Sequence, residues 1–162
     1  MSQLVLGVGE LGVCRGSGHT IKTFALGSCV SVILLDSTTK TAGMVHIALP
    51  ESEINPEKAK SMPGYFADTG VEALMEQMAR EGVALNRNTL KVKLVGGAQI
   101  MDHQGTFNIG KRNVLGVKKI LWAKGLAPIA EEVGDTISRT VTVDAESGKV
   151  IISTPNLTDR II

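Results

Sequence analysis

Three apolar segments that follow one another between residues 20 and 50 constrain the fold most strongly. Residues 20–26, 29–35 and 42–48 are separated only by a Gly-Ser break and by a turn at Asp36-Ser37-Thr38. Short apolar runs bounded by turn residues predict β-strands, and strands that are neighbours in sequence usually pair in space. The chain is therefore expected to contain a sheet built around this part of the sequence.

Each of these predicted strands carries one polar side chain that a hydrophobic core would not select. Thr23 lies in the first strand, Cys29 opens the second, and His46 lies inside the third. A thiol beside an imidazole is a nucleophile with its base, and a third polar group can hold the imidazole in place. The pattern equally fits structural roles, because free cysteines are often buried and threonine is common in strands.

The Gly-Ser break before Cys29 has its own chemical interpretation. Gly27 would let the backbone turn sharply, and the amides of the turn, with Ser28, could stabilise an oxyanion formed during attack by Cys29. In this hypothesis His46 accepts the thiol proton and later protonates the departing amine, while Thr23 holds the other imidazole nitrogen.

The rest of the sequence predicts a single layered domain, mixed α/β or α+β, with two main helices. The helices are expected over residues 65–81 and 109–124, the second capped by Asn108. Further strands are expected at 4–8, 12–14, 90–95, 127–133, 139–144 and 149–153. Residues 51–63 are polar, contain two prolines and are expected to form a loop. The domain is expected to span residues 1–155, and the tail 156–162 has no predicted structure or role.

Composition excludes several classes of protein. The formal net charge is +1 and aromatic residues make up 3%, so there is neither the basic surface nor the aromatic platform of a nucleic-acid-binding protein. No apolar run is long enough to insert into a membrane, and the first residues do not resemble a signal peptide. The two cysteines suggest no disulfide framework. A cytoplasmic protein is expected.

Neither a cofactor nor a metal ion is expected. Residues 7–12 contain the glycine spacing of a dinucleotide-binding turn, but no helical pattern follows. Residues 105–111 resemble a phosphate-binding loop, except that Arg112 replaces the Ser or Thr that binds magnesium. The cysteines and histidines lack zinc-site spacing, and we expect His19 and His103 to be solvated loop residues.

Five separated motifs resemble those of the chemoreceptor glutamine deamidases of the CheD family. The resemblance covers most of the chain, from about Val5 to about Val150. The motifs are LGSCV at 26–30 with HIALP at 46–50, YFADTGV at 65–71, GGAQIM at 96–101 and NIGKRNV at 108–114. Residues 51–63 and the tail from Asn156 match nothing in the family.

The resemblance implies an α/β layered sandwich and assigns Cys29, His46 and Thr23 to the family's catalytic positions. It implies hydrolysis of a glutamine side-chain amide to glutamate through a thioester, on the cytoplasmic helical region of methyl-accepting chemoreceptors. It also implies a partner, the phosphatase CheC. A rival hypothesis is a non-catalytic adaptor that binds receptors or CheC. A cysteine protease or a transglutaminase-like transferase would use the same residues.

Overall fold

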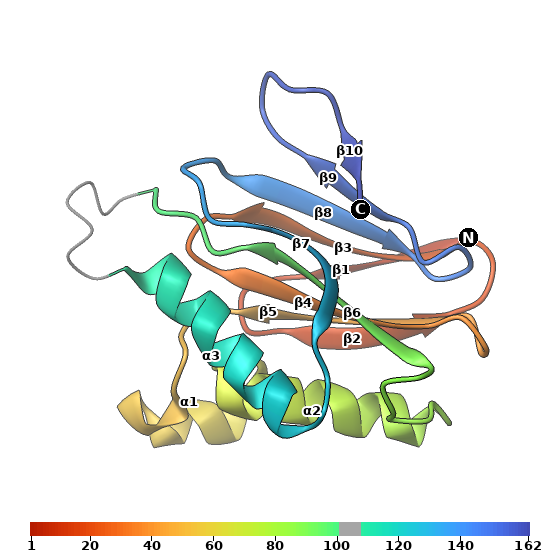
Figure 1. Cartoon of the computed structure of the whole chain (residues 1–162), viewed down its shortest axis with the longest axis horizontal. Helices are drawn as coiled ribbons and strands as arrows, with labels where there is room; N and C mark the ends of the chain where they lie inside the picture. Colours follow the sequence, from red (N-terminus) through yellow and green to blue (C-terminus); the bar gives the residue numbers. More distant parts are fainter. Residues whose placement is uncertain (101–107) are drawn as a thin grey trace.

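A computed structural model describes residues 1–100 and 108–162, and it consists of two stacked sheets with helices on one side (Figure 1). Two residues singled out by the sequence, His103 and Gly105, lie outside the described residues. His19 does not lie in a loop as expected, because it begins a strand and its ring Nδ1 is 2.6 Å from Ser2 Oγ.

Both sheets are mixed, and each contains five strands in the described part of the chain. The first sheet has the order β1 (Ser2–Leu6), β3 (His19–Leu26), β8 (Arg139–Asp144), β9 (Val150–Ser153) and β10 (Arg160–Ile161). The second has the order β2 (Leu11–Arg15), β5 (Thr41–Ile47), β4 (Val30–Asp36), β6 (Leu90–Gly96) and β7 (Pro128–Val133). The pairs β1–β3 and β6–β7 are parallel and the other pairs are antiparallel.

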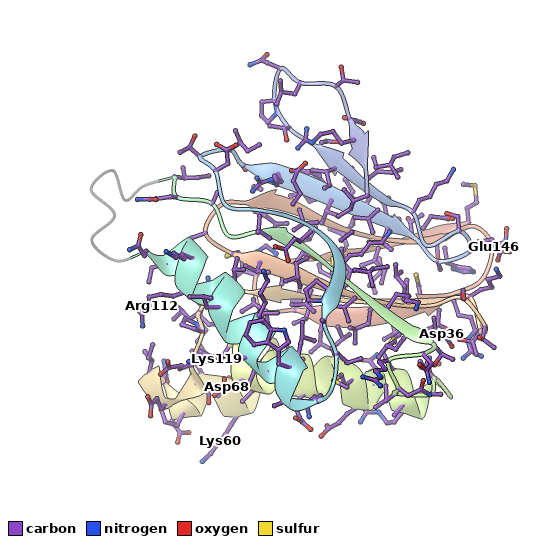
Figure 2. The ribbon with its side chains drawn as sticks, viewed as in Figure 1. Asp36, Lys60, Asp68, Arg112, Lys119 and Glu146 are labelled. Carbon is purple, nitrogen blue, oxygen red and sulfur yellow. The ribbon has the colours of Figure 1, made fainter. Side chains whose placement is uncertain are left out.

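The central strands β4 and β5 are buried on both faces, which explains their nearly continuous apolar sequence. One face of β4, with Val30, Val32 and Leu34, packs against the helices. The other face, which includes Ile33 and Leu35, packs against the first sheet. Side chains fill the space between these layers (Figure 2). The predicted mixed-sheet sandwich is therefore confirmed.

Helices α2 (Ala67–Arg80) and α3 (Ile109–Ala123) lie on the outer face of the second sheet and confirm the two predicted main helices (Figure 1). Helix α2 buries residues at helical spacing, among them Val71, Leu74 and Met78. Among the described residues no helix is long and apolar enough to cross a membrane.

Two local expectations need correction. Residues 51–63 are not a simple loop, since they contain the short helix α1 (Pro56–Ser61) between the 3₁₀ turns η1 (Ser52–Ile54) and η2 (Pro63–Tyr65). Helix α1 buries no residue, so its sequence has no apolar period to detect. Asn108 precedes α3 in a left-handed conformation (φ 48°), and its side chain does not cap the helix. The tail, for which the sequence predicted no structure, contains β10, which pairs with β9.

Candidate active site

Thr23 and His46 meet between the two sheets. Thr23 lies on β3 of the first sheet and His46 on β5 of the second, and both are almost completely buried. Thr23 Oγ1 lies 2.7 Å from His46 Nδ1 and donates a hydrogen bond of 2.8 Å to the carbonyl oxygen of Leu6. The predicted contact between the hydroxyl and the imidazole is thus present in the structure.

These two contacts determine the tautomer of the imidazole. A hydroxyl has one hydrogen, and the Leu6 carbonyl oxygen can only accept it. The hydroxyl oxygen must therefore accept a hydrogen bond from His46 Nδ1–H. Nε2 is then the nitrogen with a free lone pair, which is the arrangement that a general base requires.

His46 Nε2 is buried and has no hydrogen-bond partner among residues 1–100 and 108–162. Burial lowers the pKa of His46 to about 4, because an apolar environment disfavours the charged imidazolium. The ring is consequently neutral at physiological pH. A buried polar atom without a partner costs free energy, so its presence calls for an explanation other than packing.

Cys29 shares the inner face of the second sheet with His46. On β4, Ser31 pairs directly with His46, and Cys29 precedes Ser31 by two residues, which places both side chains on the same face. The thiol packs against the core between the sheets and is half-buried. Burial raises its pKa, so the group is a neutral thiol before substrate binds.

The Cys29 thiol borders an open cleft of about 350 Å³. The described residues that line this cleft come from the Cys29 turn, from the segment after β6 and from the start of α3. They are Ala25, Gly27, Ser28, Cys29, Ala98, Gln99, Ile100, Ile109 and Gly110. His46 is buried and does not line the cleft. A substrate in the cleft would therefore contact the Cys29 sulfur, with the imidazole behind it in the protein interior.

The turn before Cys29 is built differently from the sequence-based expectation. Its left-handed residue is Ala25 (φ 52°), at a bulge in β3, and Gly27 does not have a positive φ. The carbonyl groups of Gly27 and Cys29 accept hydrogen bonds from Ala98 and Gly97. Within the described part of the chain, no hydrogen bond uses the amide N–H of Ser28 or Cys29 as donor.

Asn113 on α3 connects the Cys29 turn to the His46 strand. Its Nδ2 group donates to the carbonyl oxygen of Ser28 at 2.9 Å and to that of Ala48 at 3.0 Å. Ser28 directly precedes the thiol, and Ala48 follows the imidazole by two residues. A single buried amide therefore sets the position of one segment relative to the other.

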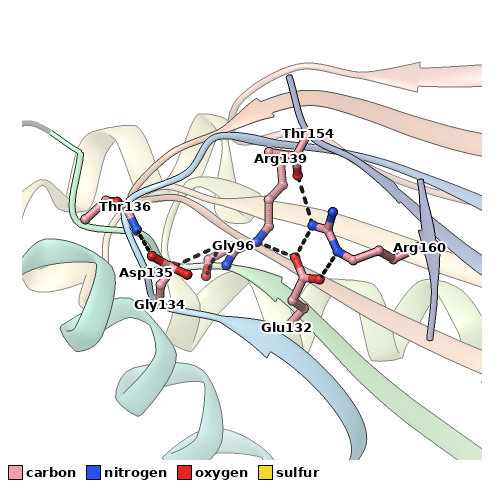
Figure 3. A network of polar contacts seen from close by, with 8 residues as sticks. All are labelled: Gly96, Glu132, Gly134, Asp135, Thr136, Arg139, Thr154 and Arg160. Carbon is pink, nitrogen blue, oxygen red and sulfur yellow. Dashed lines mark hydrogen bonds and ion pairs between the residues drawn. The ribbon is translucent and has the colours of Figure 1, made fainter. Parts of the chain in front are cut away.

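A network of charged side chains holds the end of β6 at Gly96 (Figure 3), and the chain continues from there to the cleft-lining residues Ala98, Gln99 and Ile100. Arg139 is buried and donates to the carbonyl oxygens of Gly96 and Gly134 and to the carboxylate of Glu132. Arg160 from the tail binds the same carboxylate. These hydrogen bonds hold the pKa of Glu132 below its usual value, and the bond from Arg160 has the largest effect. The tail thus helps to anchor Gly96, next to Gly97 and the Cys29 turn.

Comparison with known proteins reveals a family that matches this architecture. The family model described as CheD chemotactic sensory transduction matches residues 48–154. This chain belongs to the CheD family. A protein of Syntrophotalea carbinolica named "Probable chemoreceptor glutamine deamidase CheD" is 52% identical over 155 residues, which is 96% of each chain.

Other relatives in the CheD family also align over nearly the whole chain. A protein of Solibacter usitatus with the same name is 41% identical over 93% of this chain and 88% of its own. The "Chemoreceptor glutamine deamidase CheD" of Thermotoga maritima is 38% identical over 91% of this chain and 89% of its own. The family resemblance expected from the five motifs is confirmed.

The structure of this CheD-family chain brings the predicted site residues together to different degrees. Thr23 and His46 are in contact, and Cys29, Gly27 and Ser28 line the cleft. No hydrogen bond joins Cys29 to His46 within the described residues. In proteins without substrate, catalytic hydrogen bonds are often long and form only in the complex.

A pair of Thr23 variants separates orientation of His46 from packing. Thr23→Ser keeps the hydroxyl but removes a methyl group from the core, at a cost of about 1 kcal/mol of stability. Thr23→Val keeps the shape but leaves His46 Nδ1–H without its acceptor and removes the hydroxyl that donates to the Leu6 carbonyl oxygen. We expect Thr23→Val to lower kcat by about 10–100-fold and Thr23→Ser by only a few-fold. Melting temperatures would show how much each variant loses in stability. If Thr23→Ser and Thr23→Val lowered kcat equally, Thr23 would contribute only packing.

Asn113 variants test the proposed link between the two segments. Asn113→Leu leaves two buried carbonyl groups unpaired, so we expect a loss of about 1–3 kcal/mol of stability and a lower kcat at similar KM. In Asn113→Asp, the carboxyl can donate one hydrogen bond when protonated and none when ionised. The kcat of this variant relative to the parent should therefore fall as pH rises. If both variants fold and the ratio of the Asn113→Asp kcat to the parent kcat does not change with pH, Asn113 does not link the two segments as described.

Proposed function

We propose that this chain is a cysteine-dependent protein-glutamine amidohydrolase that converts glutamine to glutamate on chemoreceptors. The observation that carries the proposal is the orientation of His46. The Thr23 hydroxyl fixes the Nδ1–H tautomer, so Nε2 presents its lone pair on the face that also carries Cys29. The names of the relatives support the choice of glutamine and of chemoreceptors, because these proteins are called chemoreceptor glutamine deamidases.

In the proposed reaction, Cys29 Sγ attacks the carbonyl carbon of the glutamine side chain while its proton passes to His46 Nε2. The carbonyl oxygen becomes an oxyanion, for which the amide N–H groups of Ser28 and Cys29 are candidate donors. His46 then returns the proton to the nitrogen, the C–N bond breaks and ammonia leaves. A thioester remains on Cys29.

Water completes the reaction. His46 Nε2 removes a proton from the water molecule as its oxygen attacks the thioester carbonyl carbon. The C–S bond breaks, the glutamate side chain is released and the Cys29 thiol regains a proton. Throughout both steps Thr23 can accept a hydrogen bond from Nδ1–H, whether the imidazole is neutral or protonated.

The cleft suits a protein substrate better than a free amino acid. No lysine, arginine, aspartate or glutamate lines it in the described part of the structure, so nothing there would bind the ammonium and carboxylate groups of free glutamine. Binding energy from remote parts of a substrate positions the reacting group. Free glutamine should therefore show a low kcat as well as weak binding. By the family resemblance, we propose that CheC competes with the receptor for this surface.

The experiment that tests this function uses the protein with a receptor cytoplasmic fragment. Mass spectrometry should detect a gain of about 1 Da at specific glutamines, the change expected when an amide becomes an acid through a thioester. Free glutamine and an unfolded receptor peptide serve as comparisons. A similar kcat/KM for all three substrates would indicate a general glutaminase, and added CheC should slow only the reaction on the receptor.

One observation favours the rival function of a non-catalytic adaptor. The thiol and the imidazole are both neutral, and among the described residues no hydrogen bond joins them. An adaptor would need neither a thiolate nor a base. It would bind receptors or CheC equally well after Cys29 is replaced, and it would leave the mass of the receptor unchanged.

A further inference from the structure

The exposed face of helix α3 carries a regular stripe of cationic and apolar side chains. Arg112, Leu115, Lys119 and Trp122 follow one another at intervals of three, four and three residues, so they lie on one side of the helix. All four are exposed, with 47% of Leu115 and 57% of Trp122 accessible to solvent. Exposed large apolar side chains at this spacing are the pattern with which one helix packs against another.

The two cations of this α3 stripe lack acidic partners. Helix α3 contains no aspartate or glutamate, and two of its neighbouring lysines are already paired, Lys118 with Glu131 and Lys124 with Glu72. Neither Arg112 nor Lys119 forms an ion pair with any described residue. The positive charge of the stripe is therefore available to a partner.

The α3 stripe forms one wall of a groove of about 340 Å³. Pro50, Glu51 and Asp68 form the other side, and Figure 2 shows Arg112 and Lys119 on α3 with Asp68 below them on α2. The Asp68 carboxylate accepts hydrogen bonds from the amide and hydroxyl groups of Ser52, so it is already engaged within the protein. Glu51 stays exposed beside it.

The groove and the Cys29 cleft both border helix α3, although no described residue lines both. The first residues of α3, Ile109 and Gly110, line that cleft, and Arg112 follows within one helical turn. Arg112 and Lys119 are seven residues apart, which corresponds to about 10 Å along the helix. A helix lying along α3 would therefore contact both cations and could still place a side chain in the cleft.

We propose that the α3 stripe is the docking surface for the receptor helix whose glutamine enters the Cys29 cleft, an inference that rests on the proposed function. The partner is an amphipathic helix with two carboxylates about seven residues apart, on the same face as the target glutamine. The carboxylates pair with Arg112 and Lys119, and apolar side chains between them cover Leu115 and Trp122. Two observations favour this occupant over a second copy of the chain. The cations of the stripe form no ion pair with a described residue, and the stripe lies on the helix that also borders the cleft.

Trp122 makes the proposal directly measurable, because it is the only tryptophan in the chain. Titration of the Cys29→Ala protein with a receptor cytoplasmic fragment should shift the Trp122 fluorescence to the blue as the indole leaves water. The double variant Arg112→Glu/Lys119→Glu, made in the same Cys29→Ala background, should bind about tenfold more weakly at low salt, with a smaller salt dependence. Lys60→Glu is the matched control, since Lys60 is exposed on α1 and its ion pair within the described part of the chain is with Glu57.

Kinetics with Cys29 intact separate docking from chemistry. The double variant should raise KM for the receptor fragment about tenfold, with kcat and the rate of Cys29 alkylation by iodoacetamide unchanged. An unchanged KM and Kd would overturn the docking surface while leaving deamidation intact. If the fragment bound and Trp122 responded but no glutamine were converted, the proposed function would fail instead. A Trp122 shift that depended on protein concentration alone would assign the groove to a second copy and overturn the proposal.

Discussion

A Cys29→Ala variant is expected to fold like the parent protein and to lose at least about 10⁴-fold of its deamidation rate. The proposed thioester needs the Cys29 thiol, and no other cysteine is among the described residues that line the cleft. Cys29 is only half-buried, and its replacement removes one sulfur atom from the edge of the core. The cost in stability should therefore stay within about 1 kcal/mol. Ammonia release and thermal unfolding, measured on the same sample, would check both expectations.

Cys14→Ala is the matched control for this substitution. Cys14 lies on β2, is also half-buried, and is not among the described residues that line the cleft. Burial, with a smaller contribution from Asp144, raises the pKa of its thiol to about 11, so it should be inert at neutral pH. Near-normal turnover in Cys29→Ala, or an equal loss in Cys14→Ala, would refute the proposed nucleophile.

His46→Gln should produce the second-largest effect, a loss of about 10²–10⁴ in kcat/KM, which is the usual contribution of a general base. Glutamine is a better replacement than alanine in this buried position because its side chain retains much of the volume. With the base removed, the residual rate should rise with pH as hydroxide ionises the Cys29 thiol. A residual rate that is independent of pH would argue against proton transfer from the thiol to His46.

The acid side of the pH profile provides a further check on His46. The parent enzyme should keep its kcat/KM as pH falls through the ordinary imidazole value of 6.5 and lose it only near pH 4, where the buried ring becomes protonated. The measured values belong to the thiol–imidazole pair rather than to one residue.

The lowered pKa of His46 also affects stability. Between pH 6.5 and about pH 4, the imidazole binds a proton in the unfolded chain but not in the folded one. Stability should thus fall as pH drops from 6.5 towards 4, and His46→Gln should remove this dependence.

Much of the fold follows from local sequence patterns. The strands between residues 20 and 50 were predictable because they are apolar runs bounded by turn residues, and α2 was predictable because its buried residues recur at helical spacing. Helix α1 and strand β10 were not predictable. The first buries no residue, and the second has only two residues and is held by pairing with β9 and by Arg160 binding to Glu132.

The sequence was enough to propose the residues of the candidate site, but not the contacts that support them. Thr23, Cys29 and His46 stand out because each is polar within an apolar run. Asn113 carries a weaker signal, a polar residue within the buried stripe of α3, and its partners Ser28 and Ala48 are 85 and 65 residues away in sequence. Such long-range contacts depend on how the helix packs on the sheet, which no local pattern specifies.

Trapping the thioester would test the central claim most directly. The protein is mixed with a receptor fragment, quenched in acid within the first turnover and digested, and peptides containing Cys29 are analysed by mass spectrometry. The account predicts a Cys29 peptide joined to a receptor glutamine peptide, lighter than their sum by about 17 Da for the ammonia released, and cleaved by hydroxylamine. Glutamine converted to glutamate with no such adduct, and at the same rate in Cys29→Ala, would contradict it.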